Sequence, residues 1–160
     1  MIGSSARATM RARAIGRVNG ALSVGLAVVL AAAAALAQPA DVANAVVEPI
    51  TEQLEAFRRD DYDVAYRYAS AEVRQLFDRQ AFERMVKGGY PEIARSTFAF
   101  VSRTEAGANG HVYVHVKIRG ANGNGIEALY DMVRESDGWR INGVVTKPDP
   151  GLVFAPLPRG

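Results

Sequence analysis

The 160-residue sequence contains no cysteine and only two histidines, His111 and His115. Without cysteine the chain can form no disulfide, so its folded stability has to come from its hydrophobic core. If both histidines lie on one strand they share a face but stand roughly 13 Å apart, at ~3.3 Å per residue, which is too far to share a metal ion. The sequence therefore predicts a domain without a metal site and without a cofactor.

The first 37 residues contain no acidic side chain, although they carry four arginines, at positions 7, 11, 13 and 17. The rest of the chain has 15 basic and 17 acidic residues, which gives it a net charge of −2. A slightly acidic domain lacks the basic face that neutralises nucleic-acid phosphates. We therefore expect no nucleic-acid partner.

The arginines precede an apolar run from Ala21 to Leu36, which ends in the small-x-small tripeptide Ala35-Leu36-Ala37. This order is typical of a cleavable secretory signal peptide. The run is short and alanine-rich for a membrane span of ~20 residues, no cysteine follows it for lipid attachment, and no Arg-Arg pair precedes it. We expect a signal peptide over residues 1–37, general secretion to the periplasm or the outside of the cell, and no stable membrane anchor after cleavage.

Residues 38–48 are mostly small, and we expect them to form a linker. Pro49 is tolerated in the first turn of a helix, where a missing backbone amide costs nothing, but it would kink a helix that began earlier. Regular structure is therefore predicted to begin near Pro49, or a bent helix to span it. Ile50, Leu54 and Phe57 then recur at helical spacing and predict the buried stripe of this helix.

Further helices are predicted from their capping residues, because an aspartate or serine at the N-cap accepts the free amides of the first turn. Asp61, Ser70 and Asp78 each precede a stretch with helical spacing of apolar residues. We expect Leu76 to point inward. We also expect Gly88 to end the helix after Asp78 in the left-handed conformation.

The second half of the chain alternates apolar and polar residues in four runs, separated by glycine-containing turns: 97–103, 112–119, 126–134 and 139–145. Loops this short predict an antiparallel meander. The expected fold is therefore α+β, with N-terminal helices packed on a curved four-stranded sheet in a single domain over residues 49–147. Four prolines in residues 148–160 predict an extended tail that docks in part on the body.

Charge and packing together suggest a register for the sheet. Opposite charges favour Arg119 opposite Glu127, and the same register places His115 opposite Asp131. A two-residue Asp137-Gly138 turn would bring Tyr130 beside Val145, so Val145 is expected to join the packed face. Phe98 and Phe100 are expected on the same side as the inward valines of the second strand.

Aromatic side chains are the best candidates for a binding site. They cluster where the helices are expected to meet the sheet, and they could line an apolar pocket with polar tips. For at least half of them, packing in the core is the alternative. The candidates are Tyr66, Tyr68, Tyr90, Tyr130 and Trp139, together with the neighbouring Arg140.

The outer face of the sheet is the second candidate surface. Tyr113, His115, Lys117 and Leu129 mix aromatic, ionic and aliphatic groups, as protein interfaces do, so this face is a candidate homodimer interface. His115 beside Asp131 could also act as a general base oriented by a carboxylate. An exposed cross-strand pair without catalytic function is the alternative.

Several motifs together resemble one bacterial family, known as domain of unknown function 4864. They run through nearly all of the chain after the signal peptide: Ile50-x-x-Gln53-Leu54-x-Ala56-Phe57-x-x-Asp60-Asp61, Ala65-Tyr66-x-Tyr68-Ala69-Ser70, Phe82-x-x-Met85-Val86, Gly89-Tyr90-Pro91, Ala128-Leu129-Tyr130 and Trp139-Arg140-Ile141-Asn142-Gly143-Val144. The family carries no assigned activity and supplies no catalytic residues. The order of helices and then sheet also resembles the nuclear-transport-factor-two-like, or cystatin-like, superfold, which hosts enzymes and binding modules alike.

Two classes of function follow. The first is a non-enzymatic exported module that binds a small apolar ligand or a protein partner. The second is a small isomerase or lyase that uses tyrosine and carboxylate groups in the concave pocket. No buried acid–base pair can be named from the sequence, which favours the first class.

Overall fold

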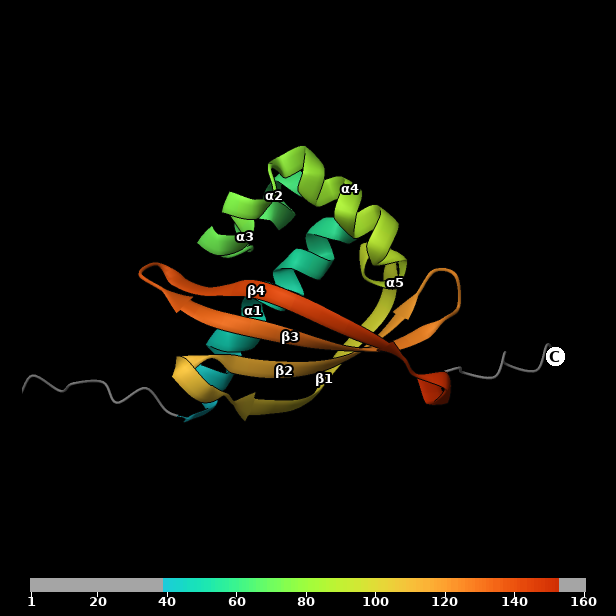
Figure 1. The fold of residues 1–160 in the computed structure, drawn as a ribbon. Helices are drawn as coiled ribbons and strands as arrows, with labels where there is room; N and C mark the ends of the chain where they lie inside the picture. Colours follow the sequence, from blue (N-terminus) through green and yellow to red (C-terminus); the bar gives the residue numbers. More distant parts are fainter. Residues whose placement is uncertain (1–38, 153–160) are drawn as a thin grey trace, which may run out of the picture. The chain divides into compact units, whose positions relative to one another are not determined.

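The structure is a computed structural model and describes residues 39–152 (Figure 1). The expected signal peptide and the last eight residues of the expected tail lie outside the described residues. Within residues 39–152, no helix combines the length and the apolar character needed to cross a membrane.

The first helix, α1, spans Pro39–Arg58 and continues through Pro49. Residues 39–48, which we expected to form a linker, are therefore helical, and the alternative of a helix spanning Pro49 is the correct one. The N-terminal extension is stabilised by packing, since Val46 is buried together with Ile50 and Leu54. Tertiary contacts of this kind outweigh the cost of an internal proline.

Four short helices follow: α2 (Tyr62–Arg67), α3 (Ala71–Leu76), α4 (Arg79–Gly89) and α5 (Pro91–Ala94). The three predicted N-caps are confirmed. The side chain of Asp61 accepts from the Val64 amide at 3.0 Å, and Ser70 and Asp78 make the equivalent bonds in α3 and α4. Two predicted details were wrong. Gly88 does not end its helix, since α4 continues through it, and Leu76 does not point inward, since it is 70% exposed.

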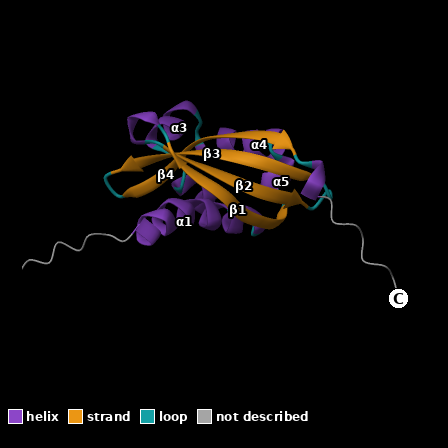
Figure 2. Ribbon diagram, turned by 90° about the horizontal axis from the view of Figure 1, so that it is seen from below, coloured by secondary structure: helices purple, strands orange, loops and turns teal. Residues whose placement is uncertain are grey.

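The strands are β1 (Ser96–Ala106), β2 (Val112–Gly120), β3 (Gly125–Glu135) and β4 (Gly138–Pro148). They pair antiparallel in the order β1-β2-β3-β4, which confirms the predicted meander (Figure 1). The 3₁₀ turn η1 (Ala108–Gly110) lies in the β1–β2 loop, and η2 (Pro150–Leu152) follows β4. The sheet is twisted, and its strands fan out in Figure 2.

The predicted β2–β3 register was wrong by two residues. His115 lies opposite Leu129, and Lys117 lies opposite Glu127. A shift of two residues keeps each side chain on its predicted face, because the side-chain period of a strand is two. Val114 and Val116 are accordingly buried as expected. The prediction paired Glu127 with Arg119 because their charges are opposite, but the residue opposite Glu127 is Lys117, which is also basic.

A bulge in β4 changes which side chains of this strand face the core. The β3–β4 register shifts between Asp131 and Met132, where Asn142 is the extra residue. Ile141 therefore lies opposite Met132, and Val144 opposite Tyr130. Val145 is 70% exposed, so its expected place on the packed face was wrong.

Phe98 and Phe100 were also placed on the wrong face. They pair with Arg119 and Lys117 of β2, whose side chains point away from the helices. Both rings are about half exposed and contact each other, with centroids 5.6 Å apart.

The core lies between the helices and the inner face of the sheet. Helix α1 contacts both edge strands, β1 and β4, so it crosses this face. Tyr62, Tyr130 and Met132 are among the largest fully buried side chains of the core. Leu152 of η2 is also buried, so this part of the tail docks on the body. The tail was expected to be extended, but Pro150–Leu152 form a 3₁₀ turn.

Candidate functional site

A cavity of about 280 Å³ opens where the helices meet β3 and β4. The exposed side chain of Leu76 belongs to its wall, so the cavity has a mouth at α3 that reaches solvent. Most of its wall is apolar and comes from α1, α3, α4, α5 and β4. The apolar lining residues are Phe57, Ala69, Val73, Leu76, Phe77, Phe82, Met85, Val86, Ile93, Ile141, Gly143 and Val144.

Aromatic contacts hold the α4 side of the wall in place. The Phe82 ring lies 6.2 Å from that of Phe57 in a stacked arrangement and 5.3 Å from that of Tyr66, centroid to centroid. Such pairs add to the burial energy of the rings and fix their relative orientation. The cavity wall on this side is therefore preformed.

Four residues bring polar atoms to the wall: Gln53, Tyr90, Tyr130 and Asn142. The Gln53 amide nitrogen donates to the Ala65 carbonyl at 3.1 Å. Asn142 accepts from Ser70 Oγ at 2.8 Å and donates to Asp131 Oδ2 at 3.1 Å. The Tyr90 hydroxyl donates to the Val144 carbonyl at 3.4 Å. These bonds orient the polar side chains within the fold.

Tyr130 differs from these three residues. Its hydroxyl is buried and has no hydrogen-bond partner among the residues the structure describes. Burial raises the pKa of this phenol far above its usual value, so the hydroxyl keeps its proton at neutral pH. A buried polar group without a partner destabilises a fold. In the described structure, no hydrogen bond compensates for the burial of the Tyr130 hydroxyl.

The structure divides the six predicted pocket residues between different places. Tyr90 and Tyr130 line the cavity. Tyr68, Trp139 and Arg140 instead line a separate groove of about 310 Å³ beside the N-terminal half of α1. The Tyr66 hydroxyl donates to the Phe77 carbonyl at 2.6 Å, so this residue links α2 to the end of α3.

Sequence reasoning missed Gln53 and Asn142 as wall residues. Gln53 occupies a buried position of α1, four residues before Phe57, and its helical spacing was the available signal. Asn142 reaches the wall because of the β4 bulge, and strict alternation carries no signal for a bulge.

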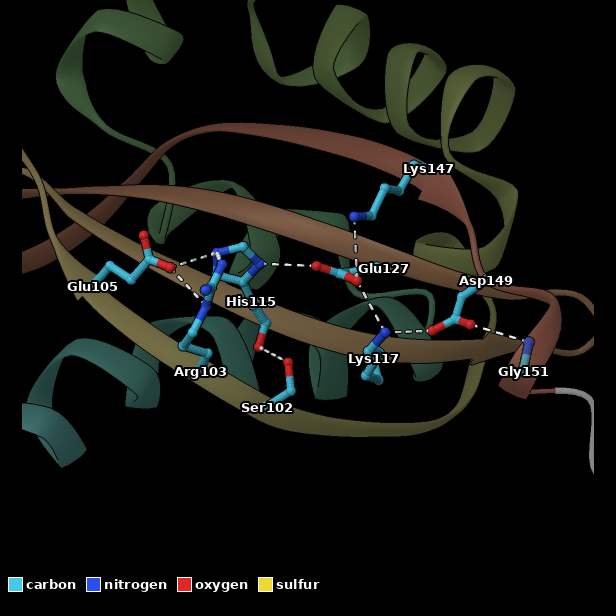
Figure 3. A network of polar contacts seen from close by, with 9 residues as sticks. All are labelled: Ser102, Arg103, Glu105, His115, Lys117, Glu127, Lys147, Asp149 and Gly151. Carbon is cyan, nitrogen blue, oxygen red and sulfur yellow. Dashed lines mark hydrogen bonds and ion pairs between the residues drawn. The ribbon is translucent and has the colours of Figure 1, made fainter.

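The outer face of the sheet carries a network of polar contacts (Figure 3). Glu127 is its centre, since its carboxylate meets His115 Nδ1 at 2.9 Å, Lys117 Nζ at 2.9 Å and Lys147 Nζ at 3.5 Å. Lys117 also bonds Asp149 at 2.5 Å, which ties the segment after β4 to β2. Lys117, followed by His115, lowers the pKa of Glu127 to about 2.

His115 was expected beside Asp131 as an oriented general base, but its partner is Glu127. Arg103 Nη2 lies 3.0 Å from His115 Nε2. Glu105 Oε1 lies 3.5 Å from the same Nε2 atom. Both ring nitrogens are thus engaged with charged neighbours, as expected for a cross-strand pair that stabilises the sheet.

Asp131 pairs instead with His111, whose Nδ1 lies 2.7 Å from Asp131 Oδ1. The other predicted interface residues, Tyr113, Lys117 and Leu129, alternate with buried residues along β2 and β3 and lie on this outer face. Among residues 39–152, no cluster of three or more histidine or acidic side chains is arranged to hold a metal ion.

Two solved structures share this arrangement of helices and sheet. One is described as an NTF2-like protein of unknown function from Shewanella baltica OS155, with a TM-score of 0.51 and 11% identity over 71% of this chain and 98% of that chain. The other, an NTF-2-like protein of unknown function from Silicibacter pomeroyi DSS-3, has a TM-score of 0.52 and 15% identity over 70% and 99%. At these identities the likeness shows the fold alone.

The chain therefore has an α+β fold similar to that of these NTF2-like proteins. The chain belongs to the family described as domain of unknown function DUF4864, whose profile matches residues 39–153. This confirms the resemblance seen in the sequence motifs. A search of curated proteins found no match.

Proposed function

We propose that this protein is a non-enzymatic module that binds a small apolar ligand in the cavity between the helices and strands β3 and β4. The observation that carries the proposal is the cavity itself, about 280 Å³ with a mostly apolar wall. Ligand sites in proteins are concave, mostly apolar and preformed, with a few polar groups that orient the ligand. The cavity has each of these properties at a size suited to a small ligand.

The enzymatic alternative needs a tyrosine and a carboxylate in one pocket. Tyr130 lies on the cavity side of β3, whereas its neighbours Glu127 and Asp131 lie on the outer face. Glu127 is engaged there with Lys117, and Asp131 bonds both His111 and the amide of Asn142. Neither carboxylate is among the described residues of the cavity wall. This separation of the two groups favours binding over acid–base catalysis.

The proposal is tested with N-phenyl-1-naphthylamine, a neutral probe whose fluorescence rises in apolar surroundings. We expect the wild-type protein to bind it with a 1:1 stoichiometry. Val144 lines the cavity, so Val144→Phe should weaken binding by about tenfold, because the larger ring takes up space that the probe needs and steric conflicts of this kind cost ~1–3 kcal/mol.

Val145→Phe is the matched control, since it makes the same change on the same strand at a residue that is 70% exposed. It should leave the affinity for the probe unchanged. Failure of the wild type to bind the probe, or equal loss in the two variants, would contradict the proposal.

We also propose that the domain is exported and acts in the periplasm or outside the cell. The support is the basic, apolar and small-residue order of residues 1–37. N-terminal sequencing of the protein recovered from outside the cytoplasm should begin at Gln38. Recovery of a chain that still begins at Met1 would refute cleavage.

A further inference from the structure

We propose that residues 153–157, which follow the described structure, pack on the side chains of Phe98 and Phe100 on the outer face of the sheet. The partner of this apolar surface is then a segment of the same chain. Three features support the contact: the exposed rings, the place where the described chain ends, and the composition of the residues that follow. The contact lies on the outer face and does not depend on a ligand in the cavity.

The apolar surface lies on β1, an edge strand of the sheet. Phe98 and Phe100 are 44% and 47% exposed, and their ring centroids are 5.6 Å apart, so the two rings form one continuous surface. They lie opposite Arg119 and Lys117 of β2. Proteins commonly cover an apolar edge strand with a loop or another segment, because a bare edge promotes aggregation.

The described chain ends on the same outer face. A Cβ atom added to Gly125 would lie 2.5 Å from Leu152 Cβ, so Leu152 covers Gly125. Gly125 lies two residues before Glu127 on β3, and positions two apart share a face, so the covered position faces outward. Asp149 pairs with Lys117 on this face, which fixes the start of the turn that carries Leu152 (Figure 3).

The distance from this point to the two rings is short. Gly125 pairs with Arg119, and Arg119 pairs with Phe98, so the three residues lie side by side across β3, β2 and β1. At ~4.8 Å between neighbouring strands, Phe98 is about 10 Å from Gly125. Two extended residues span roughly 7 Å, so Phe154 is able to reach Phe98 from Leu152 once the lengths of the side chains are added.

The composition of the segment suits side-chain packing. Residues 153–158 read Val-Phe-Ala-Pro-Leu-Pro and contain no charged side chain. Phe154 can pack against the two rings of β1, and aromatic pairs stabilise a contact beyond the area they bury. Pro156 and Pro158 lack a backbone amide, so the segment is poorly suited to pair with β1 as a regular fifth strand.

A segment of the same chain has an advantage over a second copy of the protein. Because Leu152 already lies on this face, the residues after it are held near the rings at an effective concentration in the millimolar range, about that of a short linker. Leu129 lies opposite His115 and Val145, in another row of the sheet, and is therefore outside this contact.

The contact is tested by the reactivity of an introduced thiol, since the chain contains no cysteine of its own. Phe100→Cys places one thiol beside Phe98, and its rate of reaction with iodoacetamide, a neutral reagent, reports how far it is covered. Adding Phe154→Ser should raise this rate about three- to tenfold, because partial burial of one aromatic side chain contributes a small free energy. Val145→Cys is the matched control on the same face, and Phe154→Ser should leave its rate unchanged.

Dilution identifies the occupant of the surface. Cover by the chain's own segment does not depend on protein concentration, whereas cover by a second copy is lost on dilution. We expect the rate of Phe100→Cys to stay constant from 100-fold dilution upward. A rate that rises on dilution would assign the surface to a second copy, and equal rates with and without Phe154→Ser would show that the segment does not cover it; either result overturns the proposal.

A second measurement uses the unmodified protein. Nuclear Overhauser contacts between ring protons should connect Phe154 with Phe98 and Phe100, and they should persist when the sample is diluted. In a mixture of labelled and unlabelled chains, these contacts should arise within one chain. Their absence, or their appearance only between chains, would contradict the proposal.

Discussion

Glu127 shows how one outer-face side chain couples β2, β3 and β4. Its carboxylate pairs with the side chains of Lys117, His115 and Lys147, and Lys117 also pairs with Asp149 (Figure 3). Individual exposed ion pairs contribute little to stability, but a network with several partners on one partly buried carboxylate contributes more. The lowered pKa of Glu127 is the measurable sign of this coupling.

The pKa of Glu127 predicts a pH dependence of stability. Its folded-state pKa is about 2, below the usual 4.5, so the folded state binds this proton more weakly than the unfolded state does. The stabilisation is therefore fully present above about pH 4.5 and is lost as the pH falls toward 2. Glu127→Gln should be less stable than the wild type at pH 7, and the difference should shrink below pH 4.5.

Denaturant unfolding between pH 2 and pH 7 measures this difference. Glu52→Gln, at an exposed position of α1, serves as the control and should follow the wild type across the range. A difference between Glu127→Gln and the wild type that stays constant from pH 7 to pH 2 would show that the ion network does not contribute as described.

At the scale of elements, features set by local sequence were predictable and features set by distant packing were not. The three N-caps at Asp61, Ser70 and Asp78 were found because capping depends on a side chain and an amide three residues away. The start of α1 was not found, because the buried contact of Val46 outweighs the local signal of Pro49.

The sheet illustrates the same division. Alternation in β2 identified its buried face, because period two is a property of the strand itself. The β2–β3 register and the β4 bulge at Asn142 depend on how neighbouring strands fit together, and the charge of one pair could not determine them. The composition of the cavity wall depends on these features. Tyr90 and Tyr130 were therefore predicted from the sequence, whereas Asn142 was not.

At the scale of the whole molecule, the two faces of the sheet have different surroundings. The inner face packs on the helices and forms the cavity wall, whereas the outer face combines the Glu127 network with exposed apolar groups. Those apolar groups are Phe98, Phe100 and Val145, with Leu129 half-buried between His115 and Val145. Such a mixture of apolar and ionic groups is common at protein interfaces.

We therefore propose that the outer face mediates a homodimer. Leu129→Asp would place a charge in the middle of that contact and should split the dimer, while the monomer stays folded because its core lies on the opposite face. Leu76→Asp is the control, because Leu76 is exposed away from this face. Sizing chromatography with light scattering distinguishes the states. A wild-type monomer at micromolar concentration, or a Leu129→Asp protein that unfolds, would refute this assembly.

The central claim is that the cavity under the helices is the ligand site, and the position of a bound probe tests it most directly. Nuclear Overhauser contacts from N-phenyl-1-naphthylamine to methyl-labelled protein report which side chains lie within a few ångströms of the probe. We predict contacts to the methyl groups of Met85, Val86 and Val144, and none to Val145 on the outer face. Contacts confined to Val145 and Leu129 would place the probe on the wrong face of the sheet and contradict the account.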